Sequence, residues 1–220
     1  MANIIIIGAT GLVVSSPVSS CFHRPDTFQG SHILSTSLTH PAFASISTIT
    51  RRPLPQSLAS SSRLTALEKA DTDTWPVTLT GLNTVPDVLI SGLGTTRGAA
   101  GGFANQRKID YDLNLSLAQA AAKAGVKHYV LISSSGANPN SWLAYPRMKG
   151  ELEVAVSALP FEKVVILRPG LIVGAREESR PPEYAARVVA GAMGKVSSSL
   201  KDFWAQDAEV IGRAAGKTSL

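Results

Sequence analysis

The sequence has a single cysteine, histidines without metal spacing and no long hydrophobic run. Cys21 alone excludes an internal disulfide framework and a zinc site built from several cysteines. The four histidines lack the spacing of metal ligands, so we expect no metal site. No run of about eighteen apolar residues is present, which excludes a membrane-spanning helix of the usual kind.

Residues 1–63 lack lysine and glutamate altogether, and they carry four arginines against a single aspartate. Such a composition, poor in acids and rich in serine and threonine, is typical of a mitochondrial transit peptide. The same residues contain the first two predicted strands, so their removal would destroy the fold. We therefore expect an uncleaved protein on an organelle surface rather than a processed matrix protein.

The remaining composition fits one soluble domain. The chain has 220 residues, of which 44% are hydrophobic and 17% charged, with a net charge of +5. This length supports a core that needs no covalent staples. The arginines are dispersed, and no basic stripe with interleaved aromatic residues is present, so we expect no nucleic-acid partner.

Strands and helices alternate along the chain, which predicts an α/β fold with a Rossmann-like, doubly wound parallel sheet in a single domain of residues 1–220. The expected strands are residues 3–7, 44–50, 64–67, 87–91, 128–133 and 163–167. The expected helices are residues 30–38, 105–124, 142–158, 182–192 and 205–215. The clearest is 105–124, where Leu113, Leu117 and Ala121 recur at helical spacing and Gly125 supplies the stop.

The first strand runs directly into a glycine turn, Gly8-Ala9-Thr10-Gly11. Four isoleucines followed at once by glycines are typical of a buried parallel strand that ends in a phosphate-binding loop. The glycines let the backbone approach a pyrophosphate, and the next helix offers its N-terminal amides to the charge. A third glycine is due near position 14, but Val14 stands there.

Residues 14–29 interrupt this motif. They contain two prolines and no apolar period, which predicts an irregular loop. Without them, Gly8-x-x-Gly11 would continue to Gly30 as a complete glycine motif that opens a helix. The sixteen codons keep the reading frame, and the Val14 and Gln29 codons fit the ends of an intron. We hypothesise a translated intron; the alternative is a genuine surface loop, which uniform retention in the mature transcript would establish.

Arg51 and Arg52 follow the second predicted strand. In a Rossmann sheet this position faces the adenosine ribose, where an acid binds the 2′-hydroxyl and an arginine accommodates a 2′-phosphate. The arginine pair therefore predicts NADP(H) rather than NAD(H). The alternative is a solvated pair without a ligand.

A serine run, Ser133-Ser134-Ser135, ends another predicted strand, and Tyr145 and Lys149 follow one helical turn apart. The charge of a lysine can lower the pKa of a phenol until it serves as an acid near neutral pH, and a serine can orient a carbonyl. This set suits hydride transfer between a nicotinamide and a carbonyl. Pro146 has to lie in the first helical turn to be tolerated.

Together these motifs resemble the short-chain dehydrogenase/reductase superfamily, in its atypical branch. They are most similar to the fungal "found in mitochondrial proteome" proteins of the mitochondrial outer membrane, which are relatives of the NADPH-binding 30-kDa Tat-interacting protein. The resemblance covers nearly the whole chain apart from 14–29. It is most specific in residues 8–13, 91–97, 132–136 with 145–151, and 167–170.

The resemblance implies a catalytic set of Ser134 (or Ser135), Tyr145 and Lys149. The implied cofactor-binding residues are Gly8, Thr10, Gly11, Leu12, Val13, Gly30, Arg51, Arg52, Gly92 and Lys149. Arg168-Pro169-Gly170 would end a strand on the substrate side, or would form a plain turn. Peripheral association with the cytoplasmic face of the outer membrane is also implied, whereas the substrate is not.

The leading interpretation is a protein that binds NADP(H) and reduces a small carbonyl. A non-catalytic scaffold or sensor that binds NADP(H) is the alternative, and a chain impaired by the insertion is a third. Because a phosphate site needs its turn and helix contiguous, we expect residues 14–29 to weaken NADPH binding.

Overall fold

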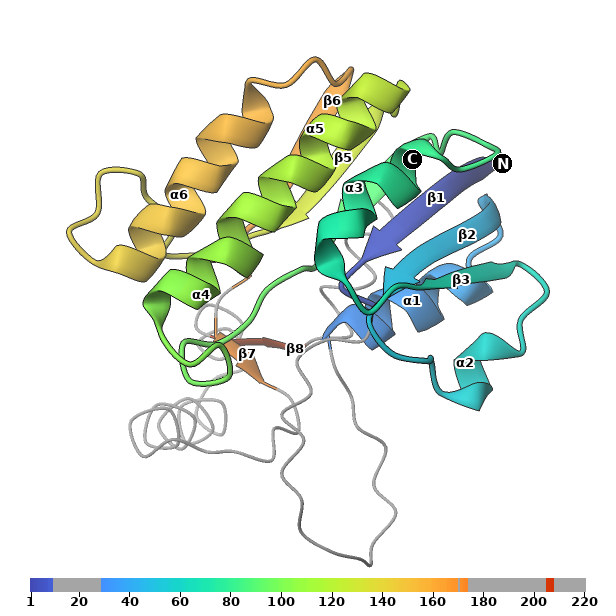
Figure 1. The fold of residues 1–220 in the computed structure, drawn as a ribbon, viewed down its shortest axis with the longest axis horizontal. Helices are drawn as coiled ribbons and strands as arrows, with labels where there is room; N and C mark the ends of the chain where they lie inside the picture. The colour runs from blue at the N-terminus through green and yellow to red at the C-terminus, as the bar shows by residue number, and fades with distance from the viewer. Residues whose placement is uncertain (10–28, 170, 174–204, 208–220) are drawn as a thin grey trace, which may run out of the picture.

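The computed structural model describes residues 1–9, 29–169, 171–173 and 205–207. Six parallel strands form one sheet in the order β3-β2-β1-β4-β5-β6 (Figure 1). They are β1 (Ala2–Ile7), β2 (Phe43–Thr50), β3 (Leu64–Glu68), β4 (Val88–Ser91), β5 (His128–Ile132) and β6 (Lys163–Leu167). The strand order reverses between β1 and β4, which confirms the predicted Rossmann-like, doubly wound sheet.

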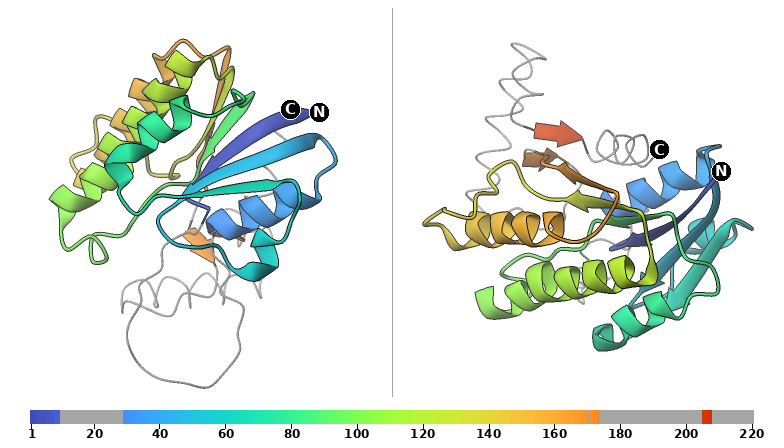
Figure 2. Two further views of the ribbon diagram at one scale, coloured as in Figure 1. Left: turned by 45° about the vertical axis from the view of Figure 1, so that its right-hand side comes forward. Right: turned by 90° about the horizontal axis from the view of Figure 1, so that it is seen from above.

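The central strand β1 is buried on both of its faces. Ile4 and Ile6 pack toward α1 (Gln29–Thr39), whereas Ile5 and Ile7 pack toward the opposite layer of helices. That layer consists of α3 (Trp75–Thr80), α5 (Asn114–Ala124) and α6 (Ala144–Ser157). Figure 2 shows the two layers on opposite sides of the sheet. Burial on both faces explains the uninterrupted run of isoleucines.

The helix predicted over residues 105–124 consists of three segments. They are α4 (Phe103–Arg107), the π-helical turn η2 (Lys108–Leu113) and α5. Gly125 ends α5 with φ +89°, as the sequence predicts. The predicted helix is confirmed, and residues 108–113 within it form a π turn instead of an α-helical one. Asp110 is only 2% exposed.

The least regular part of the sequence, residues 54–84, holds β3 and three short helical segments. They are α2 (Gln56–Ala59), the 3₁₀ turn η1 (Thr72–Thr74) and α3. Trp75 is buried, and its indole N–H donates to the Lys69 carbonyl oxygen at 2.9 Å. This bond fixes the start of α3 to the end of β3.

A separate parallel pair is formed by β7 (Leu171–Val173) and β8 (Ala205–Asp207). The helix predicted over 205–215 is therefore wrong at residues 205–207, which instead exchange strand hydrogen bonds with β7. The rest of that prediction, the helix over 182–192 and the loop over 14–28 lie outside the described residues. Within the described part, no helix is both long and apolar enough to cross a membrane.

Candidate functional site

Two glycine turns meet at the edge of the sheet where the parallel strands end. Gly8 follows β1 with φ +82°, a left-handed conformation that glycine adopts at little cost. A Cβ at Gly8 would lie 2.7 Å from the backbone carbon and oxygen of Gly92, which follows β4. The structure therefore brings these two predicted cofactor residues into contact.

Most of the first glycine turn falls outside the described residues. This applies to four predicted cofactor residues: Thr10, Gly11, Leu12 and Val13. Gly30 is the second residue of α1, and α1 packs against β1. The displaced third glycine thus opens a helix beside the first strand, as the split motif predicts.

Three polar side chains hold the second glycine turn, residues 92–96, from the helix that follows it. Gln106 donates from Nε2 to the Thr95 carbonyl oxygen at 3.0 Å. Asp110 accepts the Thr95 N–H at 2.6 Å through Oδ1. Asn114 donates from Nδ2 to the Leu93 carbonyl oxygen at 3.2 Å. We call Gln106, Asp110 and Asn114, which are spaced four residues apart, the polar ladder.

Asn114 also joins the second turn to the sheet. Its Oδ1 accepts the Ser91 hydroxyl at 2.7 Å and the Tyr129 hydroxyl at 3.3 Å, and all three residues are buried. Burial raises the pKa of Tyr129, so its hydroxyl stays protonated and able to donate. Because a buried polar group is costly when unpaired, this network specifies one position for the turn.

Asp110 and Lys149 are both buried and influence each other's charge. Burial raises the pKa of Asp110 to about 6, although the charge of Lys149 and the hydrogen bond from Thr95 act to lower it. Burial lowers the pKa of Lys149, while the charges of Asp110 and Glu153 act to raise it. The charge of each side chain therefore acts on the pKa of the other.

Lys149 reaches the end of β5, where the serine run begins. Its Nζ donates to the Ile132 carbonyl oxygen at 3.4 Å. Ser133 is buried, and its Oγ has no hydrogen-bond partner among the described residues. Ser134, the predicted carbonyl-orienting residue, follows directly and is partly buried. Lys149 and the serine run are thus brought together.

Tyr145 lies near the start of α6, one turn before Lys149. The helix begins at Ala144, so Pro146 lies in its first turn, which confirms the condition for tolerating it. Tyr145 is 40% exposed, whereas Lys149 is 3% exposed. The phenol is therefore accessible from outside, with the ammonium group of Lys149 deeper in the protein.

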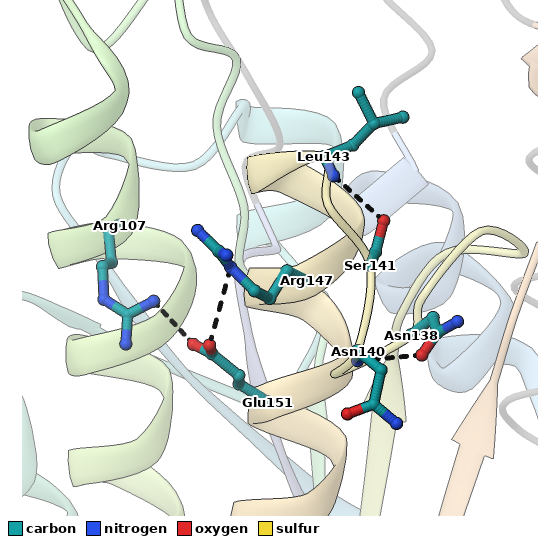
Figure 3. Close-up of polar contacts among 7 residues, drawn as sticks. All are labelled: Arg107, Asn138, Asn140, Ser141, Leu143, Arg147 and Glu151. Carbon is teal, nitrogen blue, oxygen red and sulfur yellow. Dashed lines mark hydrogen bonds and ion pairs between the residues drawn. The ribbon is translucent and has the colours of Figure 1, made fainter.

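The loop between β5 and α6 is fixed against the first turns of the helix. The Asn138 N–H donates to the Pro146 carbonyl oxygen at 3.0 Å. The Asn138 side chain in turn accepts the Asn140 N–H at 2.9 Å (Figure 3). A Cβ at Gly150 would overlap the backbone of Asn138. This close approach needs glycine at that position, and it sets the orientation of the helix start that carries Tyr145.

Arg51 and Arg52 are exposed and follow β2, the neighbour of β1. Ile49 of β2 is in register with Ile7 of β1, so the arginine pair and Gly8 leave the same edge of the sheet. Thr50 is buried beside the pair, and its Oγ1 has no partner within the described residues. The structure thus places the predicted 2′-phosphate residues at the same edge of the sheet as Gly8.

Arg168 follows β6 and pairs with a carboxylate of α6. Its Nε donates to Oε1 of the buried Glu153 at 3.0 Å. This pairing favours the structural alternative for the Arg168-Pro169 turn over a role in substrate binding. Gly170 lies outside the described residues.

Two surface hollows of about 520 Å³ each lie elsewhere on the described part of the chain. One is at the opposite edge of the sheet, beside Asp87 and His128. The other lies between α3 and η2, beside Pro76 and Lys108. In the same described part, no group of three or more His, Cys, Asp or Glu side chains could hold a metal ion.

The described edge fits a nicotinamide dinucleotide. The contact between Gly8 and Gly92 leaves no side chain over the two turns, which is what a close approach of phosphates needs. Thr50 and Ser133 each carry a buried hydroxyl without a partner in the described part, at the ends of β2 and β5. Buried polar groups of this kind are normally satisfied, so a ligand along this edge would explain both.

The sequence prediction missed the polar ladder. Asp110 and Asn114 continue, at helical spacing, the buried stripe that Leu117 and Ala121 begin. A polar residue on a stripe that should be apolar is the signal that could have identified them. The partners of these side chains could not be inferred from the sequence. The polar ladder bonds to backbone groups of a turn, and backbone groups have no sequence motif.

Comparison with known families gives matches over most of the chain, both to a family model and to individual relatives. The family model described as HIM1 matches residues 47–196. "Protein fmp52, mitochondrial" of Emericella nidulans is 52% identical over 221 residues, which cover 100% of this chain and 88% of the relative. "Protein fmp-52, mitochondrial" of Neurospora crassa is 46% identical over 210 residues, covering 93% and 86%.

Solved structures are similar in fold at low sequence identity. The Bordetella bronchiseptica enzyme WbmH in complex with NAD⁺ matches with a TM-score of 0.67 and 16% identity, over 99% of this chain and 72% of its own. The UDP-Glc/GlcNAc 4-epimerase from Campylobacter jejuni matches with a TM-score of 0.66 and 15% identity, over 98% and 73%. At this identity the likeness shows the fold.

Proposed function

The chain belongs to the family described as HIM1 and to the family of the fungal fmp52 proteins, and from this premise we propose that it is an NADP(H)-dependent oxidoreductase of the short-chain dehydrogenase/reductase type. Its substrate would be a small carbonyl compound. The fold of the NAD-bound WbmH enzyme supports the nicotinamide part of this proposal.

One observation carries the proposal: Lys149 reaches the end of β5 from α6, beside the serine run and one turn below the accessible Tyr145. This end of β5 lies at the same edge as the Gly8–Gly92 contact. A nucleotide and a proton donor would therefore meet at one edge of the sheet.

The chemistry assigns one task to each side chain. A bound reduced nicotinamide supplies the hydride for the carbonyl carbon. The Tyr145 hydroxyl gives its proton to the carbonyl oxygen, and Ser134 donates a hydrogen bond to the same oxygen. The Lys149 charge lowers the pKa of the phenol, which makes proton transfer near neutral pH easier, and its ammonium group also anchors the ribose.

The choice of NADP(H) rests on Arg51 and Arg52. Both are exposed at the end of β2, where the 2′-phosphate of a bound dinucleotide would lie. We expect the double substitution Arg51→Ala with Arg52→Ala to weaken NADPH binding by about tenfold or more, while NADH binding changes little. Equal losses for both nucleotides in a calorimetric titration would argue against this assignment.

The activity is tested by measuring NADPH oxidation with a panel of small aldehydes and ketones. Tyr145→Phe keeps the ring and removes the proton, so turnover should fall by about a hundredfold or more while NADPH still binds. Ser141→Ala is the control, because it removes a hydroxyl that accepts the Leu143 N–H in the loop before α6 (Figure 3). Unchanged turnover in Tyr145→Phe would overturn the catalytic part of the proposal.

A second candidate is a scaffold or sensor that binds NADP(H) without turnover. The observation in its favour is that burial lowers the pKa of Lys149, since a neutral lysine could not activate Tyr145. An absence of NADPH oxidation with the whole panel, together with tight NADPH binding, would favour this candidate. A cellular phenotype that survives Tyr145→Phe would point the same way.

Residues 14–29 provide a test of the first glycine turn. Deleting them joins Gly11-Leu12-Val13 directly to Gly30, and we expect NADPH to bind at least about tenfold more tightly to the shortened chain. Equal dissociation constants for the two chains would refute the split-motif hypothesis. This comparison requires no knowledge of the substrate.

The relatives' names support a mitochondrial location. We propose peripheral attachment to the cytoplasmic face of the outer membrane. On intact mitochondria, external protease should then digest the protein, and alkaline carbonate should release it. Protection from protease would contradict the proposed face, and resistance to carbonate would contradict peripheral attachment.

A further inference from the structure

We propose that the loop before α6 is a membrane-contact surface, whose tip inserts into the headgroup region of a bilayer that contains anionic phospholipids. The tip consists of Trp142 and Leu143, and we call these two residues the apolar tip. Arg107 of α4 and Arg147 of α6 would meet the lipid phosphates. This inference deepens the proposed peripheral attachment and rests on it, because it names the surface through which the chain would be attached.

The apolar tip protrudes from the protein. Trp142 is 87% exposed and Leu143 is 47% exposed. The loop that carries them projects at the start of α6 (Figure 1). A side chain as exposed as Trp142 does not line a cavity, so the tip is not built to enclose a small substrate. It is suited to entering another medium, and tryptophan is enriched where a bilayer meets water.

Hydrogen bonds hold the loop in the shape that exposes the tip. The Leu143 N–H donates to Oγ of Ser141 at 3.2 Å (Figure 3), and the Ser141 N–H donates to the Asn138 carbonyl oxygen at 3.0 Å. The Asn138 N–H is bonded in turn to the Pro146 carbonyl oxygen in α6. Trp142 therefore stands between two bonded neighbours. Because the loop is already ordered, its insertion costs little further conformational entropy.

The loop carries no charge that a bilayer would have to accept. Residues 136–146 contain no aspartate, glutamate, lysine, arginine or histidine. A charged side chain in this loop would oppose insertion, because moving an ion out of water is costly. The first charged residue after the tip is Arg147, one helical turn further along. An uncharged loop followed by an arginine matches the boundary between acyl chains and phosphates.

The charges beyond the loop favour an anionic surface. Arg107 and Arg147 share one carboxylate, that of Glu151, at 2.8 Å and 3.9 Å (Figure 3). Two positive charges against one negative charge leave this group with a net positive charge. Arg97, in the loop before α4, is also exposed. Anionic lipids would therefore be attracted to the side of the molecule that carries the apolar tip.

The size of the apolar tip favours a lipid surface over a protein partner. A stable protein interface buries about 800 Å² on each side, over roughly 20–30 residues. One aromatic side chain supplies about 150–250 Å², so Trp142 together with Leu143 falls well short of that area. A bilayer needs no matching partner surface, since buried apolar area and attraction to anionic lipids together give reversible binding.

The first test measures binding to vesicles of phosphatidylcholine and phosphatidylinositol by flotation. We expect Trp142→Ala to weaken binding by at least about tenfold, because it removes most of the apolar area that would enter the bilayer. Val77→Ala removes an apolar side chain of α3 that is 74% exposed, and it should leave binding unchanged. Both positions are on the surface, so both variants should fold.

The outcomes separate this inference from the other proposals. Equal vesicle binding by the wild type and Trp142→Ala would overturn the role of the tip and leave peripheral attachment in place. A wild-type protein that does not bind vesicles would overturn the lipid contact altogether. If Trp142→Ala then also fails to bind intact mitochondria, the partner of the tip is a protein. None of these measurements depends on turnover of NADPH.

The second test reports the surroundings of Trp142 itself. Of the three tryptophans in the chain, Trp75 is 3% exposed and cannot reach lipid, and Trp204→Phe removes the third. In this background we expect vesicles to shift the fluorescence of Trp142 to shorter wavelength, and brominated acyl chains to quench it. Fluorescence that stays unchanged while the vesicles bind would overturn insertion of the tip.

The third test concerns the positive charges. Vesicles of phosphatidylcholine alone should bind the wild-type protein about fivefold more weakly than vesicles that contain phosphatidylinositol, and high salt should reduce this difference. Equal binding to the two kinds of vesicle would contradict the part of the proposal that assigns the lipid phosphates to Arg107 and Arg147.

Discussion

The two glycine turns lie in contact, but the protein holds them by different means. The first turn is positioned by a close backbone contact, because Gly8 adopts φ +82° and its backbone packs directly against Gly92. The second turn is positioned by hydrogen bonds, which the side chains of the polar ladder make to the backbone of Leu93 and Thr95. One turn therefore depends on the absence of a side chain, and the other on the presence of three.

This difference determines how each turn can fail. A backbone contact that is already at van der Waals distance cannot yield, so an added methyl group must move a strand end. A ladder of hydrogen bonds can lose one member and retain the others, at the cost of whatever buried group is left unpaired. The following predictions compare these two kinds of failure, from the largest effect to the smallest.

Gly8→Ala should be the most damaging single change at this edge. The positive φ costs about 1–2 kcal/mol, and the overlap with Gly92 adds roughly 1–3 kcal/mol. Gly125→Ala shares the positive φ, with nothing within 4 Å of its Cβ, and isolates the first cost. The difference between the two variants in their loss of unfolding free energy, measured with urea, is therefore the cost of the close approach between Gly8 and Gly92. Equal losses of stability would show that the contact at Gly8 costs nothing.

Asn114→Leu should break the polar ladder at its C-terminal end. The substitution keeps the volume but leaves the Ser91 and Tyr129 hydroxyls and the Leu93 carbonyl group without their partner. We expect a loss of about 2–3 kcal/mol in the free energy of unfolding. Ser91→Ala alone should cost about 1 kcal/mol, and it should cost less in the Asn114→Leu background. Strict additivity of the two substitutions would show that Ser91 and Asn114 are not coupled.

The same contrast explains how much of the molecule could be predicted from the sequence. The run of isoleucines, the glycine after it and the position of Gly125 are local signals, and the predicted strands and the Rossmann order followed from them. The edge at which Arg51, Gly8 and Gly92 meet follows from parallel topology alone.

What the sequence could not reveal depends on contacts between distant segments. The π turn at 108–113 leaves no mark on the pattern of apolar residues. Asp110 is a polar residue, and it is buried because of the hydrogen bonds that it makes. The charged state of Lys149 likewise depends on Asp110, which is far from it in sequence. The structure gives the positions of Ser134 and Tyr145, whereas their predicted catalytic roles remain predictions.

Stability should also depend on pH through the ladder. The pKa of Asp110 is raised from 3.8 to about 6 on folding, so the folded protein binds a proton more tightly than the unfolded chain. Stability is therefore greatest below about pH 4 for this group and is lost as pH rises to about 6, by an amount on the order of 3 kcal/mol. The free energy of unfolding, measured between about pH 4 and about pH 6 for the wild type and for Asp110→Asn, isolates the contribution of this carboxyl group. If the difference between the two proteins does not change with pH, the raised pKa of Asp110 is contradicted.

The smallest effect should come from the ion pairs that join α4 and α6 at the surface. Arg107 of α4 pairs with Glu151 of α6 at 2.8 Å, and Arg147 lies 3.9 Å from the same carboxylate (Figure 3). The three side chains are between 34% and 51% exposed, so water screens their attraction. Glu151→Gln should change the free energy of unfolding by about 0.5 kcal/mol or less, and high salt should abolish the change. A loss as large as that of Asn114→Leu would mean that the surface pair, and not the buried ladder, sets the distance between the helices that carry Asp110 and Lys149.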